Sequence, residues 1–379
     1  MSAKQVLISA GEASSEMYAA RLAACLRAKT GAHLFGMGGP RMAEAGAELI
    51  ADYHQVAVVG LSEVVHKIPT VIGVQRHLAR EAVRRSASLA ILVDSPSTHF
   101  GVARRLHRHG IPVGYFIGPQ VWAWRAGRMR VIKRLVNRMV VIFPFEEKIY
   151  REAGVPVDFV GHPLVDVVRP TSTRQEFAAQ FGLDAKRPIV TLLPGSRRSE
   201  IAQHYPRIME ACARLANGPD QIAGVQFVLA AAPGLGADLF TTLATRSGVS
   251  VTRIEGSTYN ALSAADCAIV ASGTATVEAA LLGTPMVIVY RVSEISAFLL
   301  RRMIRTPYIG MVNLIAGKQV APEFVQEKFT PERVAGELKR LLESQAAREE
   351  MKAELAKVRA RLGPGGAIER AADIFARMM

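Results

Sequence analysis

Two short segments in the second half of the chain contain the residues of an anion-binding site. They are Thr191–Glu200 and Ala271–Ala280, and each has the pattern of a strand end, a turn of small residues and a helix start. Amides at a helix N-terminus, strengthened by the helix dipole, bind phosphate without a metal ion. Each segment alone is also common in α/β proteins that bind no phosphate. Together they predict a site for a nucleoside diphosphate.

The groups expected to hold this diphosphate are main-chain amides, one guanidinium and one carboxylate. Arg197 has a planar guanidinium whose paired N–H donors suit a diphosphate. The alternative interpretation is that Arg197 is an ordinary solvated arginine. Glu278 lies one helical turn after Thr274 on the same face, so its carboxylate can accept hydrogen bonds from a ribose diol. No Asp-x-Asp sequence occurs, which disfavours a metal-carried diphosphate, and we expect neither a metal nor a cofactor. The predicted binding residues are Gly195, Ser196, Arg197, Ser272, Gly273, Thr274 and Glu278.

Asp94 is the candidate general base. It follows the apolar run Leu89–Val93, and Pro96 follows closely, so the carboxylate is expected at the carboxyl end of a strand. Ligands of open α/β sheets bind at this edge. The alternative is that Asp94 caps a loop or a helix. A base must come within hydrogen-bond reach of the proton that it removes, so geometry decides between the two.

Other candidates in the first half each have two interpretations. Glu12, in the glycine turn Gly11–Glu16, either faces a ligand or caps the helix amides. Trp122 either packs in a core with its indole amine hydrogen-bonded or forms a wall of an acceptor site. His99 and His162 are single histidines without a second one at metal-ligand spacing, and such residues are more often structural than metal ligands.

The composition favours anionic partners inside a cell. The chain has 379 residues, a formal net charge of +14 and three widely spaced cysteines, Cys25, Cys212 and Cys267. Phosphorylated substrates, an acidic membrane surface and nucleic acid all fit the charge. Aromatic residues make up 6% and do not interleave with basic clusters, which disfavours nucleic acid. The unpaired cysteines, the short apolar run at the N-terminus and the lack of a membrane-spanning run predict a cytoplasmic protein.

Strands alternate with helices along the whole chain, which predicts an α/β protein with parallel, doubly wound sheets. We expect two Rossmann-like domains, residues 1–165 and 166–366, with a final helix in 367–379 returning to the first. Two such domains that face each other would enclose a cleft. The expected strands include those at Val6, Leu34–Met37, Leu89–Val93, Val113–Ile117, Met139–Phe143, Ile189, Val225–Ala230, Val249–Ile254, Cys267–Ala271 and Pro285–Tyr290.

Two segments combine apolar and basic side chains in the manner of a membrane-surface element. They are Val56–Arg76 and Ile295–Arg305, and the second sets Phe298 and its apolar neighbours among three arginines. Basic amphipathic segments lie on anionic membranes without crossing them. Packing at a domain interface is the alternative interpretation.

Several motifs in a fixed order resemble one known family, the lipid-A-disaccharide synthases, which are inverting glycosyltransferases with the GT-B fold. The resemblance runs nearly end to end, and a set of such motifs is far more specific than any one of them. The motifs are Gly11-Glu-Ala-Ser14, Gly39-Pro-Arg-Met42, Val121-Trp-Ala-Trp-Arg125, Phe143-Pro-Phe-Glu146, Gly161-His-Pro163, Leu193-Pro-Gly-Ser-Arg197, Ala271-Ser-Gly-Thr-Ala-Thr276 with Glu278, and Asn313-Leu-Ile-Ala316 with Gln326.

The resemblance implies transfer of 2,3-diacylglucosamine from its UDP donor to the 6-hydroxyl of 2,3-diacylglucosamine 1-phosphate, giving a β-1,6 disaccharide and UDP. It implies a first domain for the acceptor, a second domain for UDP and a place on the cytoplasmic face of the inner membrane. A homo-oligomer is compatible with it. By position, Asp94 matches the suspected base, and Arg197 and Asn313 match polar residues of the active site. The acceptor-site candidates are Glu12, Ser14, Trp122 and Gln326.

The departures from the family pattern lie in the presumed acceptor domain. The usual Gly-Asp after the first motif is Ser15-Glu16 here, and the usual Asp-Ala-Pro-Asp-Phe-Asn is Asp94-Ser-Pro-Ser-Thr-His99, so Ser97 replaces an acid. Acceptor identity and acyl-chain preference are therefore left open. The rival functions are another lipid-linked GT-B glycosyltransferase, a UDP-sugar epimerase and a non-catalytic, membrane-associated UDP-sugar binder.

Overall fold

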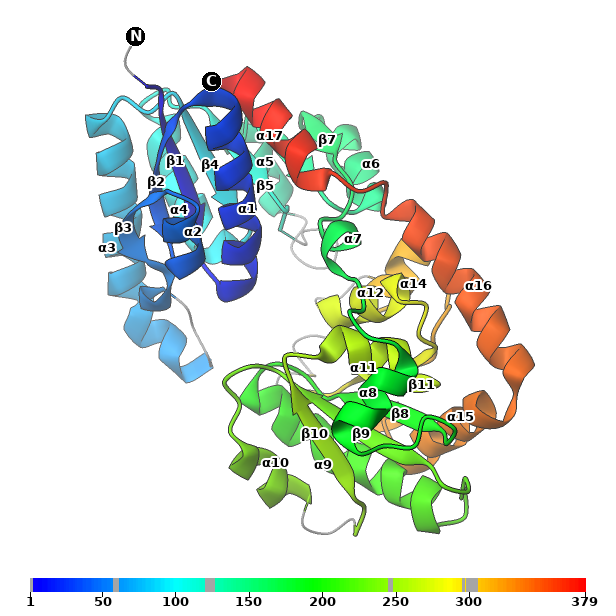
Figure 1. The fold of residues 1–379 in the computed structure, drawn as a ribbon. Helices are drawn as coiled ribbons and strands as arrows, with labels where there is room; N and C mark the ends of the chain where they lie inside the picture. The colour runs from blue at the N-terminus through cyan, green and yellow to red at the C-terminus, as the bar shows by residue number, and fades with distance from the viewer. Residues whose placement is uncertain (1–2, 57–60, 120–126, 245–247, 295–296, 298–305) are drawn as a thin grey trace. The chain divides into compact units, whose positions relative to one another are not determined.

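The chain forms two compact units, each built on one parallel β-sheet (Figure 1). The first comprises residues 1–163 and 362–379, and the second comprises residues 164–361. The computed structural model describes residues 3–56, 61–119, 127–244, 248–294, 297 and 306–379, with the backbone alone for 61–66 and 244. Trp122, residues 57–66 and most of residues 295–305 therefore lie outside the described residues or side chains, and their predicted roles stay predictions.

The first unit contains a seven-stranded sheet in the order β3-β2-β1-β4-β5-β6-β7, with every neighbouring pair parallel. The order reverses beside β1, so the carboxyl ends of β1 and β4 flank the point where a doubly wound sheet binds its ligand. The strands are β1 Gln5–Ala10, β2 His33–Gly38, β3 Glu48–Asp52, β4 Leu89–Val93, β5 Val113–Phe116, β6 Arg138–Val141 and β7 Val157–Phe159.

Helices cover both faces of this sheet. On one face α1 packs beside α17, the last helix of the chain (Figure 1). Phe375 of α17 lies against Phe116 of β5. On the other face α3, α4 and α5 share a core with the strands. The helices of this unit are α1 Ala13–Thr30, α2 Pro40–Glu44, α3 Leu61–Arg84, α4 Pro96–His107, α5 Arg128–Leu135, α6 Pro144–Glu152 and α17 Ala367–Met378, with the 3₁₀ turn η1 Tyr53–Gln55.

The second unit contains a six-stranded parallel sheet in the order β10-β9-β8-β11-β12-β13. Here β8 and β11 flank the reversal. The strands are β8 Ile189–Leu193, β9 Gln226–Ala231, β10 Val251–Glu255, β11 Cys267–Ala271, β12 Met286–Tyr290 and β13 Glu323–Val325. The helices are α7 Leu164–Val167, α8 Arg174–Phe181, α9 Arg198–Asn217, α10 Ala237–Ala244, α11 Thr258–Ala264, α12 Thr274–Leu281, α14 Met311–Ala316, α15 Pro331–Glu343 and α16 Gln345–Arg361, with the 3₁₀ turn η2 Gln326–Lys328.

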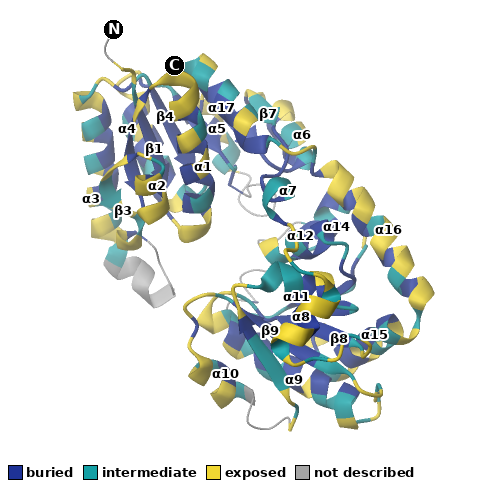
Figure 2. Ribbon diagram, in the orientation of Figure 1, coloured by how far each residue is buried: buried dark blue, intermediate teal, exposed yellow. Residues whose placement is uncertain are grey.

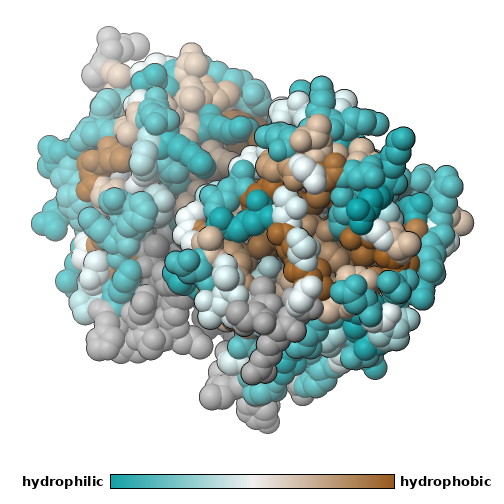
Figure 3. Space-filling view, turned by 60° about the horizontal axis from the view of Figure 1, so that its bottom comes forward, coloured by the Kyte–Doolittle hydropathy of each residue, from teal (hydrophilic) through white to brown (hydrophobic). Residues whose placement is uncertain are grey.

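The central strands are buried on both faces, which is why their sequences are almost continuously apolar. Every residue of β4, β8 and β11 is buried, whereas the edge strands β3 and β13 contain no buried residue (Figure 2). Hydrophilic residues cover much of the face in view in Figure 3, with hydrophobic residues in smaller groups between them. Among the described helices, none has the length and apolar content needed to cross a bilayer.

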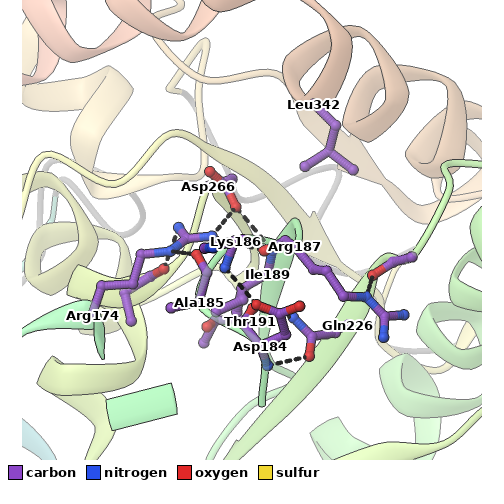
Figure 4. Close-up of polar contacts among 12 residues, drawn as sticks. Arg174, Asp184, Ala185, Lys186, Arg187, Ile189, Thr191, Gln226, Asp266 and Leu342 are labelled. Carbon is purple, nitrogen blue, oxygen red and sulfur yellow. Dashed lines mark hydrogen bonds and ion pairs between the residues drawn. The ribbon is translucent and has the colours of Figure 1, made fainter. Parts of the chain in front are cut away.

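An arginine fastens the amino-terminal edge of the second sheet (Figure 4). Arg174 of α8 donates to the carbonyls of Ala185, Ala264 and Arg187 and pairs with the carboxylate of Asp266 at 2.9 Å. The same carboxylate accepts from the amide of Ile189 at the start of β8. These bonds fix the starts of β8 and β11, so the opposite ends of the two strands lie in a defined register.

The parallel, doubly wound sheets predicted from the alternation of strands and helices are confirmed in both units. The boundary lies after Pro163, where 165 was predicted, and the chain returns to the first unit at Leu362 rather than in 367–379. The strands β3, β7 and β13 were not predicted. They have three to five residues and are half-exposed at or near sheet edges, so they lack the apolar runs of the central strands.

Candidate active site

Asp94 lies directly after β4 in a left-handed turn. Its φ is 51° and that of Ser95 is 47°, and Pro96 then begins α4. The Asp94 amide donates to the Phe116 carbonyl of β5, so the residue continues the strand by one hydrogen bond before the chain turns. Non-glycine residues adopt this conformation rarely, and such strain concentrates at functional sites. The predicted place of Asp94 at the carboxyl end of a strand is confirmed.

The carboxyl group of Asp94 is electrostatically unusual. The residue is half-buried. Burial, with a further contribution from the negative charge of Glu12, raises the pKa of Asp94 to about 6, and the amide of Ser95 opposes the shift. A carboxylate with this pKa is ionised at pH 7 and still accepts a proton far more readily than an ordinary aspartate does. This is the property that a general base near neutral pH needs.

The first glycine turn lies at the neighbouring strand end, after β1. Glu12 and Ser14 are exposed there, and the amide of Glu12 donates to Ser15 Oγ. Glu12 is the N-cap residue of α1 and forms a capping box with Ser15, in agreement with the capping alternative. Its negative charge also raises the pKa of Asp94, and its contact with a ligand stays a prediction. The departure Glu16 is buried, and its Oε1 accepts from the amide of Met42 at the start of α2. Glu16 therefore supports the loop after β2.

In the second unit, the turn after β8 is already occupied by a carboxylate of the chain. Glu200 Oε2 lies 3.3 and 3.4 Å from the amides of Ser196 and Arg197, and its Oε1 pairs with the exposed guanidinium of Arg197 at 3.1 Å. A Cβ on Gly195, whose φ is 127°, would come within 2.8 Å of Glu200 Oε2. The expected amide donors of this turn are thus engaged internally, while the exposed guanidinium of Arg197 makes its described contact with Glu200 through Nη1 alone.

The turn after β11 is more open. Ser272 is engaged, because its amide donates to the Val289 carbonyl and its Oγ to the Ile309 carbonyl, which corrects its expected role as a free donor. Gly273 has φ 151°, and a Cβ there would meet nothing within 4 Å. Thr274 begins α12 and is exposed. The first amides of a helix have no partner within it, so Gly273 and Thr274 form the better anion site of the two turns.

Glu278 stands one turn along α12 from Thr274. Its Oε1 accepts from Tyr259 Oη at 3.2 Å, and burial raises the pKa of Glu278, an effect that the Tyr259 bond opposes. A half-buried carboxylate with one hydrogen-bond donor retains acceptor positions for a diol. The predicted juxtaposition of this carboxylate and the glycine turn on one helix is confirmed.

The side chain of Asn313 is fully hydrogen-bonded within the second unit. Its side chain is buried, and Oδ1 accepts from the amides of Val320 and Ala321 while Nδ2 donates to the Ala321 carbonyl and to Glu323 Oε1. An asparagine amide has two donors and two acceptor positions, so all are used. Glu323 also accepts from the amides of Ile309 and Gly310. These bonds favour a positioning role for Asn313, because contact of its amide with substrate would break them, and the catalytic role implied by the resemblance stays a prediction.

Gln326 belongs to the second unit, where its amide is bonded to a loop. Oε1 accepts from the amide of Val292, and Nε2 lies 3.3 Å from the Val292 carbonyl. Arg291 donates to the Gln326 carbonyl. These contacts fix the loop after β12, and contact of Gln326 with the acceptor remains a prediction.

His204, which no sequence pattern singled out, joins two strand ends of the second sheet. This buried residue of α9 has Nδ1 2.7 Å from the Pro194 carbonyl after β8, so Nδ1 carries the proton. Nε2 then accepts from the amide of Arg291 after β12 at 2.9 Å. Burial lowers the pKa of His204, so it stays neutral at pH 7. A single histidine in a helix of mixed composition looks ordinary, and only the fold reveals its two partners.

Two surface hollows of the first unit lie away from these groups. One of about 420 Å³ is lined by Gln5, His33, Arg84 and Arg85, and another of about 440 Å³ by Asn137, Arg138 and residues of α17. Both lie at the amino ends of strands, where α/β sheets rarely bind ligands. Among the described residues, no group of three or more His, Cys, Asp or Glu side chains is arranged to hold a metal. The candidate site is therefore defined by the carboxyl-end residues.

Comparison with known proteins decides which chemistry these groups serve. The family model for lipid-A-disaccharide synthetase matches residues 6–374. Two proteins named lipid-A-disaccharide synthase, from Solibacter usitatus and Geobacter sulfurreducens, are 45% and 43% identical to the chain, over 97% and 99% of it and 96% and 97% of their own lengths. The chain belongs to the lipid-A-disaccharide synthase family.

Membership selects among the rival functions. The chain is a glycosyltransferase, and the family reaction transfers 2,3-diacylglucosamine from UDP to 2,3-diacylglucosamine 1-phosphate. A UDP-GlcNAc 2-epimerase from Neisseria meningitidis, solved with UDP-GlcNAc bound, matches 99% of this chain and 100% of its own with a TM-score of 0.65 and 12% identity. That likeness concerns the fold alone. It fits the expected GT-B architecture, and the sequence family separates the synthase from the epimerases.

Proposed function

We propose that Asp94 is the general base of the transfer and that Gly273, Thr274 and Arg197 bind the diphosphate of the donor. The observation that carries the proposal is the position of this half-buried carboxyl group, in a left-handed turn at the carboxyl end of β4, where burial raises its pKa to about 6. Asp94 accepts the proton of the acceptor 6-hydroxyl as the oxygen attacks the anomeric carbon. The bond from that carbon to the UDP oxygen breaks on the opposite side, which inverts the configuration, and UDP leaves with the bonding electron pair.

The second unit supplies the groups for the leaving nucleotide. Negative charge grows on the diphosphate as the bond breaks, and preorganised amides at the start of α12 stabilise it. The guanidinium of Arg197 adds a positive charge, and pairing with Glu200 holds the loop that carries it. Glu278 accepts hydrogen bonds from the ribose diol. Asn313 positions the loop 320–323 and does not contact the substrate in this proposal.

The first unit supplies the acceptor groups. Glu12 and Ser14 are exposed at the strand end beside Asp94, which supports their assignment to the acceptor site. Ser97, which replaces the usual acid, is exposed in the first turn of α4. The replaced carboxylate would therefore lie on the surface rather than in the buried surroundings of Asp94.

The test compares wild-type protein with Asp94→Asn. Each is incubated with UDP-2,3-diacylglucosamine and the diacylated monosaccharide phosphate, and disaccharide and UDP are measured by mass spectrometry. We expect turnover to fall by a factor on the order of 10² to 10⁴ while UDP affinity by calorimetry changes less than about threefold. Near-normal turnover of Asp94→Asn would remove the residue from the role of base.

We further propose that the first unit rests on an anionic membrane surface, the inner-membrane face, through a basic surface of α3, α4 and α5. Between Glu81 and Glu146 the chain has a single acidic residue, Asp94. The cations of this surface form no salt bridge among the described residues, whereas Arg84, Arg85 and Arg138 nearby are all paired with carboxylates. The basic surface consists of Arg76, Arg80, Arg104, Arg105, Arg108, Arg130, Lys133 and Arg134.

The cations of α3 and α4 are mutual neighbours. Burial, followed by the charges of Arg76, Arg108 and Arg104, lowers the pKa of Arg105. Unpaired like charges at close range cost free energy that an opposing anionic surface relieves, and each basic residue near such a membrane contributes about 1 kcal/mol to binding. Ile68 of α3, with 47% of its surface exposed, adds an apolar contact on the same helix as Arg76.

Flotation with vesicles rich in phosphatidylglycerol tests the basic surface. The variant Arg104→Glu, Arg108→Glu and Arg130→Glu should lose binding, and wild-type binding should weaken as salt rises. The control is Lys148→Glu, Lys352→Glu and Lys357→Glu, which changes the net charge equally on other helices. Equal flotation of both variants, or equal binding to neutral phosphatidylcholine, would contradict this part of the proposal.

A further inference from the structure

The main-chain carbonyl of Asp94 is held by two side chains from different elements. His99 Nδ1, in the first turns of α4, and Tyr115 Oη, on β5, each lie 2.6 Å from the carbonyl oxygen. Both side chains are fully buried. A carbonyl oxygen only accepts, so both groups donate to it. The peptide unit between Asp94 and Ser95 is therefore fixed by two short hydrogen bonds.

A third residue fixes the histidine. Because Nδ1 donates to the carbonyl, Nδ1 carries the proton, and burial lowers the pKa of His99 to about 4, so the ring is neutral at pH 7. Its Nε2 then accepts from the hydroxyl of Ser9, which lies 2.9 Å away on β1 and is also fully buried. One chain of hydrogen bonds thus joins β1, α4, the end of β4 and β5.

This chain of bonds acts where the backbone is strained. Two successive non-glycine residues, Asp94 and Ser95, have positive φ, a conformation that costs free energy in a residue with a side chain. Such a conformation persists only when surrounding contacts impose it. The two donors are among the contacts that hold this peptide, and the direction of the Asp94 side chain depends on its orientation.

We propose that His99 and Tyr115 are positioning residues that hold the Asp94 turn and thereby fix the direction of its carboxyl group for proton removal. This inference rests on the proposed role of Asp94 as the base. Neither residue touches substrate in the proposal. The inference also accounts for His99, which stands where the family usually has asparagine. Histidine Nδ1 and asparagine Nδ2 are the same number of bonds from the backbone, and either can donate to a carbonyl.

The charged and titratable groups around Asp94 and its two donors come from several neighbouring elements. Glu12 follows β1, His99 belongs to α4 and Tyr115 belongs to β5. Tyr150 of α6 and Arg128 of α5 act on Tyr115. Burial lowers the pKa of His99 to about 4 and raises the pKa of Tyr115 well above its ordinary value, so both stay neutral between about pH 5 and 8. The acidic limb is the fall in kcat/KM as the pH is lowered. A change in this limb between about pH 5 and 8 therefore reports on the carboxyl groups.

Three substitutions separate hydrogen bonding from packing. His99→Asn keeps a donor at the Nδ1 position, His99→Gln places its nitrogen at the Nε2 position and leaves the Asp94 carbonyl without that donor, and Tyr115→Phe removes one oxygen. We expect His99→Gln and Tyr115→Phe to lower kcat by about 10- to 100-fold with little change in KM. Loss of the fixed turn exposes Asp94, so the acidic limb of kcat/KM should move from near pH 6 toward about pH 4. His99→Asn should stay close to wild type in both.

Asp94→Asn makes the outcomes distinguishable. In that background His99→Gln and Tyr115→Phe should lower the residual turnover no further, because they act through the carboxyl group. Normal turnover of Asp94→Asn would refute the proposed base itself. If Asp94→Asn is inactive while Tyr115→Phe keeps the wild-type kcat and acidic limb, the positioning inference is wrong. Equal losses in His99→Asn and His99→Gln, or additive losses in the Asp94→Asn background, would also overturn it. Tyr115→Phe keeps the ring and so decides the question if His99→Gln fails to fold.

Discussion

Glu12 and Asp94 are two carboxylates at the carboxyl ends of the neighbouring strands β1 and β4. Burial and, second, the charge of Glu12 raise the pKa of Asp94 to about 6. The pair resembles other sites in which one carboxylate makes its neighbour a stronger base. Since no cation among the described residues forms a salt bridge with Asp94, the folded protein bears the cost of keeping it ionised at neutral pH.

This cost predicts that Asp94→Asn stabilises the protein above about pH 6. The folded pKa of Asp94 exceeds its unfolded value near 4, so the contribution of Asp94 to stability is fully present below about pH 4 and is lost as the pH rises through 6. Allowing for partial exposure, the gain in Asp94→Asn should be about 1 to 2 kcal/mol at pH 8. Urea unfolding at pH 8 and pH 4 measures it. A gain of the same size at both pH values would show that the effect is not electrostatic.

Glu12→Gln should move the acidic limb of kcat/KM to lower pH. Removing the negative charge of Glu12 eliminates the second cause of the raised pKa of Asp94, while burial remains. We expect a shift of a few tenths of a unit to about one pH unit. The matched control is Glu44→Gln, an exposed carboxylate on α2, which should leave the limb in place. An unmoved limb in Glu12→Gln would mean that the two carboxyl groups are not coupled during turnover.

Gly273→Ala should weaken UDP binding more than it destabilises the fold. Gly273 and Gly283 both have positive φ, 151° and 69°, and a Cβ added at either would have no atom within 4 Å. Each alanine variant should therefore lose about 1 to 2 kcal/mol of stability from backbone strain. Only at Gly273 would the methyl group also meet a diphosphate, so calorimetry should show a UDP Kd at least about tenfold higher there. Equal UDP affinity in the two variants would argue against a phosphate at this turn.

The predictable part of this protein follows from long apolar runs. Leu89–Val93 and Cys267–Ala271 are buried on both faces of their sheets, and such runs identified the central strands and therefore the strand ends that carry Asp94 and Gly273. Short edge strands such as Glu323–Val325 have no such signal. The left-handed conformation of Asp94 and Ser95 could not be predicted from the sequence either, because glycine marks most left-handed turns and no glycine is present there.

Side-chain partners were the least predictable feature. Asn313 matches a motif, yet its four hydrogen bonds go to residues seven to ten positions along the chain, which only the folded loop brings into reach. His99 looked like an ordinary structural histidine, and its position beneath the Asp94 carbonyl depends on the packing of α4 against β1 and β5. Spacing along one helix, as for Thr274 and Glu278, is the case in which a pattern in the sequence predicts a juxtaposition correctly.

Glu278→Ala should separate ribose recognition from phosphate recognition. If Glu278 accepts hydrogen bonds from the ribose diol, its loss weakens UDP binding by about 1.5 to 3 kcal/mol, since hydrogen bonds to a charged group are the stronger ones. Pyrophosphate lacks the ribose, so its affinity should be unchanged or slightly higher once the nearby negative charge is gone.

Tyr259→Phe is the control, because it removes the hydroxyl that donates to Glu278 and leaves the carboxylate in place. That variant should bind UDP at least as well as wild type, since one acceptor position of Glu278 becomes free. A parallel loss of UDP and pyrophosphate affinity in Glu278→Ala would instead assign the residue to the structure of the phosphate turn.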